Sequence, residues 1–174
     1  MKRRLQSLRI AIRNVPNAAI WLRCALIYLI FVLLAAPIGF SSGFLKIEWM
    51  YASRAMLALT AARLVAVPAL LEEILFRVLL VPHPSEHKSA RHVLVVSALS
   101  LIVFVAVHPL NGIFVRVQSR AVFTDPIFLT LAALLGLACT VAYRISGSIW
   151  PPVAMHWATV AVWTICLGGK RMLG

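Results

Sequence analysis

Residues 71–77 read Leu-Glu-Glu-Ile-Leu-Phe-Arg, and they place two carboxylates and one guanidinium inside a strongly apolar run. The chain has only five acidic residues, so this short stretch holds two of them. An unpaired charged side chain at the centre of a bilayer costs about 2.5–3.5 kcal/mol on insertion scales. Such groups usually face the interior of a helix bundle or a water-filled cavity. The stretch therefore predicts a polar site inside a membrane protein.

The composition of the whole chain agrees with this interpretation. Of its 174 residues, 62% are hydrophobic and 13% are charged, and the mean hydropathy is +0.94. These values indicate an integral membrane protein rather than a soluble domain. The net charge is +12, but the basic residues flank apolar runs instead of forming one stripe or a nucleic-acid motif. We therefore expect contacts with anionic lipid headgroups and no nucleic acid.

Five apolar segments predict an all-α fold, a polytopic membrane bundle of about five transmembrane helices around a polar intramembrane site. Each segment is close to the ~20 residues that a helix needs to cross a hydrocarbon core of ~30 Å. The segments are roughly residues 24–44, 56–81, 91–109, 126–143 and 151–167.

Residues 1–23 differ from the rest of the chain, which leads us to divide it into a basic amphipathic segment, 1–23, and a single transmembrane domain, 24–174. Apolar residues spaced for one helix face alternate with bases here, so we expect a short interfacial helix. The bias of basic residues predicts a cytoplasmic N-terminus. Spans that are helices rather than β-strands predict a plasma or other inner membrane. The bases are Lys2, Arg3, Arg4, Arg9, Arg13 and Arg23, and the apolar residues are Leu5, Leu8 and Ile12.

The spacing of the three charges suggests separate roles. Glu73 and Arg77 are i and i+4 on a helix, with the acid N-terminal to the base, which is the favourable order for an ion pair. Glu72 lies about 100° around the helix from Glu73 and cannot share Arg77 equally. The simplest interpretation is a structural Glu73–Arg77 pair with Glu72 free for chemistry. The alternative is one structural ion cluster of all three.

Two histidines, His108 and His156, fall in the third and fifth segments. Since proline follows His108, we expect it at the last turn of its helix. A carboxylate can act as general base on water, and a histidine can share its proton or donate to an oxyanion. A zinc site of Glu/His/His type is also chemically possible, but the His-Glu-x-x-His spacing is absent. We expect no metal and no cofactor.

Other candidate metal sites are weaker. Cys24, Cys139 and Cys166 are far apart and show no metal-binding spacing, so we interpret them as packing residues. A loop rich in histidine is interpreted as solvated rather than as a metal site. It contains His83, Glu86, His87 and His92.

Three sequence blocks in order resemble the CPBP family, the CAAX-protease and bacteriocin-processing (Abi) intramembrane proteins. The resemblance covers about residues 68–163, and it implies an all-helical membrane fold with a water-accessible cavity and glutamate-dependent endoproteolysis. The blocks are Glu72-Glu73-x-x-x-Arg77, Phe104-x-x-x-His108 and Gly147–Pro151 leading to His156.

The resemblance also implies residue roles. Glu72 would activate water together with His108, and His156 would help to bind the oxyanion. Supporting roles fall to Glu73, Arg77 and Phe104. The expected substrate is a membrane protein or a lipidated peptide.

The family's third motif commonly has asparagine or aspartate four residues after the histidine, where this chain has Val160. Valine cannot donate a hydrogen bond, and the loss of one oxyanion donor typically costs about 10²–10³ in rate. Thr159 and Asn111 are the candidates to replace it. An alternative function for the same fold is a non-catalytic membrane scaffold or bacteriocin-immunity protein.

Overall fold

The predicted all-α membrane bundle is confirmed by the structure, a computed structural model that describes residues 2–173 and the side chains of residues 4–173. Within these residues there is no β-strand, only one isolated bridge between Glu48 and Leu167. The principal helices are α1 (Lys2–Arg13), α2 (Ala18–Ser41), α3 (Arg54–Leu64), α5 (Ala90–Phe114), α7 (Pro126–Ser146) and α8 (Trp150–Cys166). The shorter turns are η1 (Val65–Leu70), α4 (Leu71–Glu73), η2 (Ile74–Val78), η3 (Pro84–Glu86), η4 (Val117–Ser119), α6 (Arg120–Phe123) and α9 (Gly169–Leu173).

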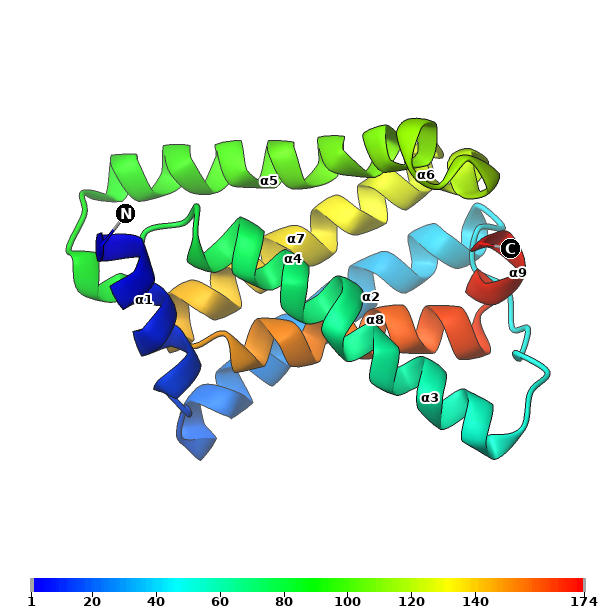
Figure 1. Cartoon of the computed structure of the whole chain (residues 1–174), viewed down its shortest axis with the longest axis horizontal. Helices are drawn as coiled ribbons and strands as arrows, with labels where there is room; N and C mark the ends of the chain where they lie inside the picture. The colour runs from blue at the N-terminus through cyan, green and yellow to red at the C-terminus, as the bar shows by residue number, and fades with distance from the viewer. Residues whose placement is uncertain (1, 174) are drawn as a thin grey trace.

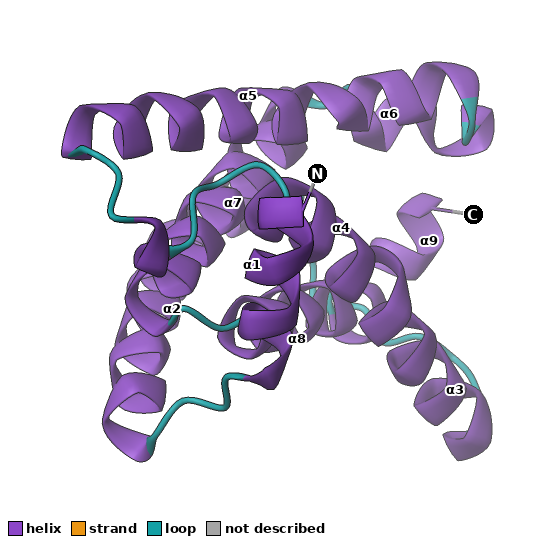
Figure 2. Cartoon of the chain, turned by 60° about the vertical axis from the view of Figure 1, so that its left-hand side comes forward, coloured by secondary structure: helices purple, strands orange, loops and turns teal. Residues whose placement is uncertain are grey.

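Four helical stretches within the described residues are long and apolar enough to span a membrane: Ala18–Ser41, Arg54–Val78, Ala90–Phe114 and Pro126–Ser146. They correspond to the first four predicted segments. The fifth forms α8, which has 17 residues and so is about 25 Å long. Helix α8 lies in the middle of the bundle, beside α1, α2, α4 and α7 (Figure 2). Many of its side chains are buried, including His156.

Helix α5 runs along one side of the molecule and α7 lies beneath it (Figure 1). The expectation that α5 ends at His108 is wrong, because the helix continues through Pro109 to Phe114. A proline inside a helix removes one backbone donor, and packing in a membrane bundle tolerates this loss. His108 therefore lies inside its helix, with more than a turn of helix after it.

Helix α1 is attached to one end of the bundle (Figure 1). Its Ala11 is fully buried, whereas Leu5 is exposed, so the helix presents one face to the bundle and another outward. The Asn14 side chain donates to the carbonyl oxygen of Ser146 at 2.9 Å, and Trp150 Nε1 donates to that of Ile12 at 2.9 Å. The side chains of Lys2 and Arg3, counted above among the bases, lie outside the described ones.

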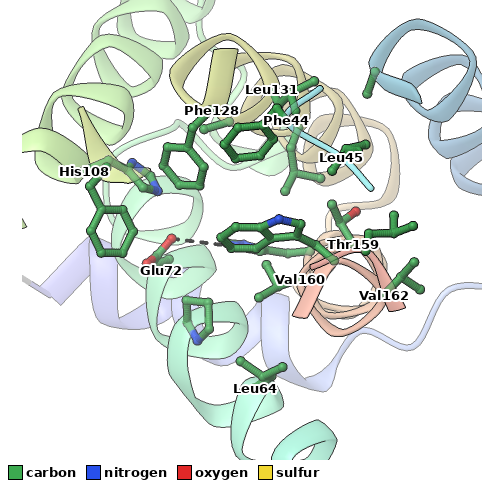
Figure 3. A pocket seen from close by; sticks show the side chains of 18 of the residues that line it. Phe44, Leu45, Leu64, Glu72, His108, Phe128, Leu131, Thr159, Val160 and Val162 are labelled. Atoms are coloured by element: carbon green, nitrogen blue, oxygen red, sulfur yellow. Dashed lines mark ion pairs between the residues drawn. The ribbon is translucent and has the colours of Figure 1, made fainter. Parts of the chain in front are cut away.

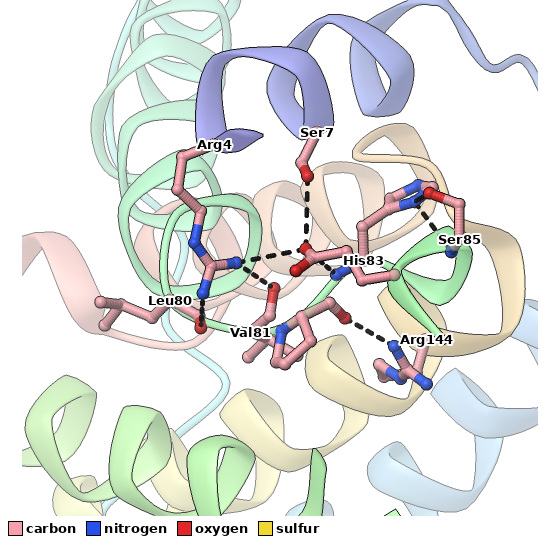
Figure 4. Close-up of polar contacts among 9 residues, drawn as sticks. Arg4, Ser7, Leu80, Val81, His83, Ser85 and Arg144 are labelled. Atoms are coloured by element: carbon pink, nitrogen blue, oxygen red, sulfur yellow. Dashed lines mark hydrogen bonds and ion pairs between the residues drawn. The ribbon is translucent and has the colours of Figure 1, made fainter. Parts of the chain in front are cut away.

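The histidine-rich loop is not simply solvated, because His83 is buried against the end of α7. Its Nε2 lies 3.1 Å from the carbonyl oxygen of Gly147. Glu86 accepts from the backbone N–H of His83 at 2.8 Å and from the Ser7 hydroxyl at 3.3 Å, and it pairs with Arg4 at 3.4 Å (Figure 4). These contacts join α1 to the loop after η2.

Candidate active site

The helix that carries the two glutamates is broken just before them. Val67 has extended backbone angles, φ −138° and ψ 117°, inside an otherwise helical stretch. Proline disfavours the α conformation of the residue before it, so Pro68 accounts for the break. The chain then resumes as a separate half-helix, α4 and η2, which carries Glu72, Glu73 and Arg77. The break allows this half to point its polar groups toward α5 and α8.

Glu73 is fully buried and joins two partners. Its Oε2 lies 3.1 Å from Arg77 Nε, so the predicted i,i+4 ion pair is present. Its Oε1 accepts a hydrogen bond of 2.8 Å from His156 Nδ1. Because a carboxylate can only accept, the Nδ1 atom carries the proton, and Nε2 is the free ring nitrogen of His156. Glu73 therefore fixes the orientation of the imidazole.

Arg77 is 1% exposed and fits into a closely packed space between α5 and α7. Its Nη2 donates to the carbonyl oxygen of Gly136 at 3.0 Å. Its guanidinium carbon lies 4.4 Å from the ring centre of Phe104, in a cation–π contact. A Cβ atom on Gly136 would approach Arg77 Nη2 to 3.1 Å and Leu101 Cδ1 to 2.7 Å. A larger residue at position 136 would therefore displace the side chains of Leu101 and Arg77.

Glu72 differs from its neighbour, because its side chain is 27% exposed. Its Oε2 lies 3.8 Å from the free Nε2 of His156, which is too long for a direct hydrogen bond. No ion pair joins Glu72 to Arg77 in the described part of the chain. Glu73 therefore pairs directly with Arg77, and Glu72 lies near His156, which also hydrogen-bonds to Glu73.

His108 contributes a second free ring nitrogen. Its Nδ1 donates to the carbonyl oxygen of Phe104 at 2.8 Å, so Nε2 is left without a proton in the neutral ring. The ring also packs edge-on against Phe104, with the centroids 4.9 Å apart, and against Phe128 at 5.3 Å. Of the two histidines, His156 is the one within ion-pairing distance of Glu72. No hydrogen bond or ion pair joins His108 to Glu72 in the part of the chain that the structure describes.

Glu72, His108 and His156 line one cavity of about 510 Å³ (Figure 3). Its remaining lining is mostly apolar and aromatic. It comes mainly from α2, the loop after α2, α3, α5, α7 and α8, and it includes Tyr28, Phe44, Phe128 and Trp163. Val160 also lines it. The cavity thus combines a small polar group of side chains with a large apolar chamber.

Sequence reasoning predicted six site residues, of which the structure brings Glu73, Arg77, Phe104 and His156 into contact. It did not identify the carbonyl oxygen of Gly136 as the acceptor for Arg77. A signal existed, because Ala132, Gly136 and Thr140 repeat at four-residue spacing on α7, a pattern typical of close helix packing. No group of three or more His, Cys, Asp or Glu side chains in residues 2–173 is arranged to hold a metal ion.

Comparison with known families agrees with the motifs. A family model, the type II CAAX prenyl endopeptidase Rce1-like family, matches residues 52–162, which is more than half of the chain. No curated protein and no solved structure matches the chain. The matched range contains both glutamates, Arg77, Phe104 and both site histidines. The chain is an integral membrane protein that belongs to the Rce1-like family of type II CAAX prenyl endopeptidases.

Proposed function

We propose that the protein is an intramembrane endopeptidase that hydrolyses a peptide bond with water activated by Glu72. The observation that carries this proposal is the convergence of the Glu72 carboxylate and the two histidines on one cavity. A carboxylate within one water of the reacting carbonyl is a suitable general base. Glu72 Oε2 is buried 3.8 Å from His156 Nε2, so Oε1 is the carboxylate oxygen proposed to contact the water.

In the proposed reaction, Glu72 takes a proton as the water oxygen bonds to the scissile carbonyl carbon. The carbonyl π electrons move to the carbonyl oxygen, which becomes the oxyanion. When this electron pair re-forms the carbonyl, the C–N bond breaks, its electrons leave with the nitrogen, and the proton held by Glu72 passes to that nitrogen. The Nε2 of His108, free of a proton, accepts a hydrogen bond from the same water. His108 thereby orients the water, with no metal ion in the scheme.

His156 would stabilise the oxyanion by donating from Nε2. Since its Nδ1 proton is committed to Glu73, this requires a second proton on the ring. The imidazolium and Arg77 would then balance the charges of Glu72 and Glu73, so the buried cluster would be neutral overall. Neutrality matters because an unbalanced charge away from water is costly.

The substrate class proposed is a membrane protein or a lipidated peptide. The support is the apolar lining of the cavity, which suits a ligand that brings apolar surface to a polar cleavage centre. Anionic headgroups are proposed as further partners of the basic N-terminal segment. We also propose that the N-terminus is cytoplasmic, in a plasma or other inner membrane.

A second function of another kind is a non-catalytic membrane scaffold or immunity protein. The observation that favours it is Val160, which lines the cavity and offers no donor to an oxyanion. The two functions differ in what they require of Glu72. A scaffold needs the shape of the bundle, whereas a protease needs the carboxylate.

The test compares protein N- and C-termini in native cells that express wild-type protein or Glu72→Gln at equal levels. New termini that disappear in the variant would support proteolysis and identify the substrates. Glu48→Gln is the matched control, because Glu48 pairs with Arg171 at 2.8 Å and does not line the cavity. Identical termini in wild type and Glu72→Gln would exclude the proposed protease. Cleavage by metal-free protein in the presence of a chelator would exclude a metal-dependent mechanism.

A further inference from the structure

The cavity contains a polar side chain that the scheme above does not use. Asn111 lies on α5, three residues after His108, and it lines the same cavity. Phe104, His108 and Asn111 follow the spacing i, i+4, i+7, so they form one stripe on the helix. Side chains on a helix lean toward its N-terminus. The amide of Asn111 therefore leans toward the turn that carries His108.

The side chain of Asn111 is half-buried and makes no hydrogen bond to any described residue, although its backbone oxygen accepts from Val115 and Arg116. Its amide atoms are not among the fully buried ones, so they are open to the cavity. A substrate in the cavity could therefore supply the missing hydrogen-bond partner.

Thr159, the other donor that the sequence suggested as a replacement, is already engaged. Its hydroxyl lies 2.9 Å from the carbonyl oxygen of Met155, one helical turn earlier, and 3.2 Å from the Tyr28 hydroxyl. A threonine hydroxyl has one proton, and the carbonyl oxygen can only accept. With that proton given to Met155, Thr159 accepts from Tyr28 and has none left for a substrate.

We propose that the side-chain amide of Asn111 donates a hydrogen bond to the oxyanion of the tetrahedral intermediate, in place of the donor that Val160 cannot supply. This inference rests on the proposed function. No proton leaves Asn111 in this step: its N–H group binds the oxygen that receives the carbonyl π electrons and releases it when the carbonyl re-forms. Asn111 would thus be a catalytic residue provided by α5 rather than by α8.

The probe is a synthetic peptide that spans the strongest Glu72-dependent cleavage site, added to purified protein in lipid vesicles. Asn111→Leu keeps the approximate size and removes the donors. We expect kcat to fall about 10²–10³-fold, as for other oxyanion donors, with KM changed less than about threefold. Thr159→Val is the matched control in the same cavity and should retain kcat within about fivefold, because its proton is not available to the substrate.

A second substitution distinguishes a catalytic role from a structural one. The double variant Asn111→Leu/Val160→Asn should have a kcat at least tenfold higher than Asn111→Leu alone, because Val160→Asn returns a donor to the cavity from α8. Loss of activity in Asn111→Leu without rescue, or a drop in Thr159→Val that equals that of Asn111→Leu, would overturn the inference. If Asn111→Leu is fully active while Glu72→Gln is inactive, the inference about Asn111 is wrong and the proposed protease function stands. Absence of any Glu72-dependent cleavage site would reject both.

Discussion

Glu73 Oε1 accepts a 2.8 Å hydrogen bond from His156 Nδ1, and these two residues are 83 positions apart in the chain. This bond leaves His156 Nε2 free and places it 3.8 Å from Glu72 Oε2. The two adjacent glutamates therefore have different surroundings. Glu73 is buried between two cationic or hydrogen-bonding partners, and Glu72 faces the cavity.

Substitutions of the two glutamates should affect different properties. Glu72→Gln should affect cleavage, and Glu73→Gln should affect stability. Glu72→Gln should abolish cleavage while the free energy of unfolding in mixed detergent micelles changes by less than about 1 kcal/mol, because Glu72 is partly exposed. Glu73→Gln should lower that free energy by about 3–5 kcal/mol, because it leaves buried Arg77 without its anion. Equal stability of the two variants would contradict the division of roles.

Lysine at position 77 should not preserve the stability that Arg77 provides. Arg77→Lys keeps the charge next to Glu73 but loses the planar contact with Phe104 and the geometry of donation to the Gly136 carbonyl. We expect a loss of about 1–3 kcal/mol in the free energy of unfolding. Arg77→Met removes the charge as well and should cost more. If Arg77→Lys unfolds at the same detergent composition as wild type, these two contacts contribute nothing to stability.

The close approach of α5 and the Arg77 side chain to α7 can be tested at Gly136. A Cβ atom at this position would lie 2.7 Å from Leu101 Cδ1 and 3.0 Å from Phe104 Cδ1. Gly136→Ala should therefore lower the free energy of unfolding by about 1–3 kcal/mol, as overpacking does elsewhere. Leu137→Ala is the control on the same helix, since Leu137 is 51% exposed. A neutral Gly136→Ala would show that α7 can shift at no cost.

The contact between α1 and the loop at Glu86 should weaken in acid. Burial alone would raise the pKa of Glu86, but the His83 backbone N–H, Arg4, Ser7 and Lys88 together lower it below the ordinary value of 4.5. A lowered pKa means that the folded state favours the carboxylate. Its stabilising contribution is thus fully present above pH 4.5 and is lost as the pH falls through the folded-state pKa.

Hydrogen exchange of the α1 amides measures this effect. Exchange should become faster in wild type as the pH is lowered below 4.5, after correction for intrinsic rates, and Glu86→Gln should show this faster exchange at neutral pH already. Glu48→Gln serves as the control, because Glu48 pairs with Arg171 and makes no contact with α1 that the structure records. Acid-independent protection of α1 in wild type would refute the role of Glu86.

Part of the site was predictable because it depends on neighbours along one helix. The Glu73–Arg77 pair follows from i,i+4 spacing, and the effect of Pro68 on the residue before it follows from local sterics. The end of α5 was not predictable in this way. His108-Pro109 has the local signature of a helix end, yet tertiary packing carries the helix on to Phe114.

The sequence by itself determined that this protein is a helical membrane bundle with a paired polar site. Its apolar segments and its glutamates leave few other ways to satisfy backbone and charged groups away from water. Only the tertiary structure decided which glutamate faces the cavity, which nitrogen of His156 is free, and that Asn111 lines the same cavity without a hydrogen bond from its side chain to any described residue. Those features depend on contacts between helices far apart in the chain, and no periodicity within one helix specifies them.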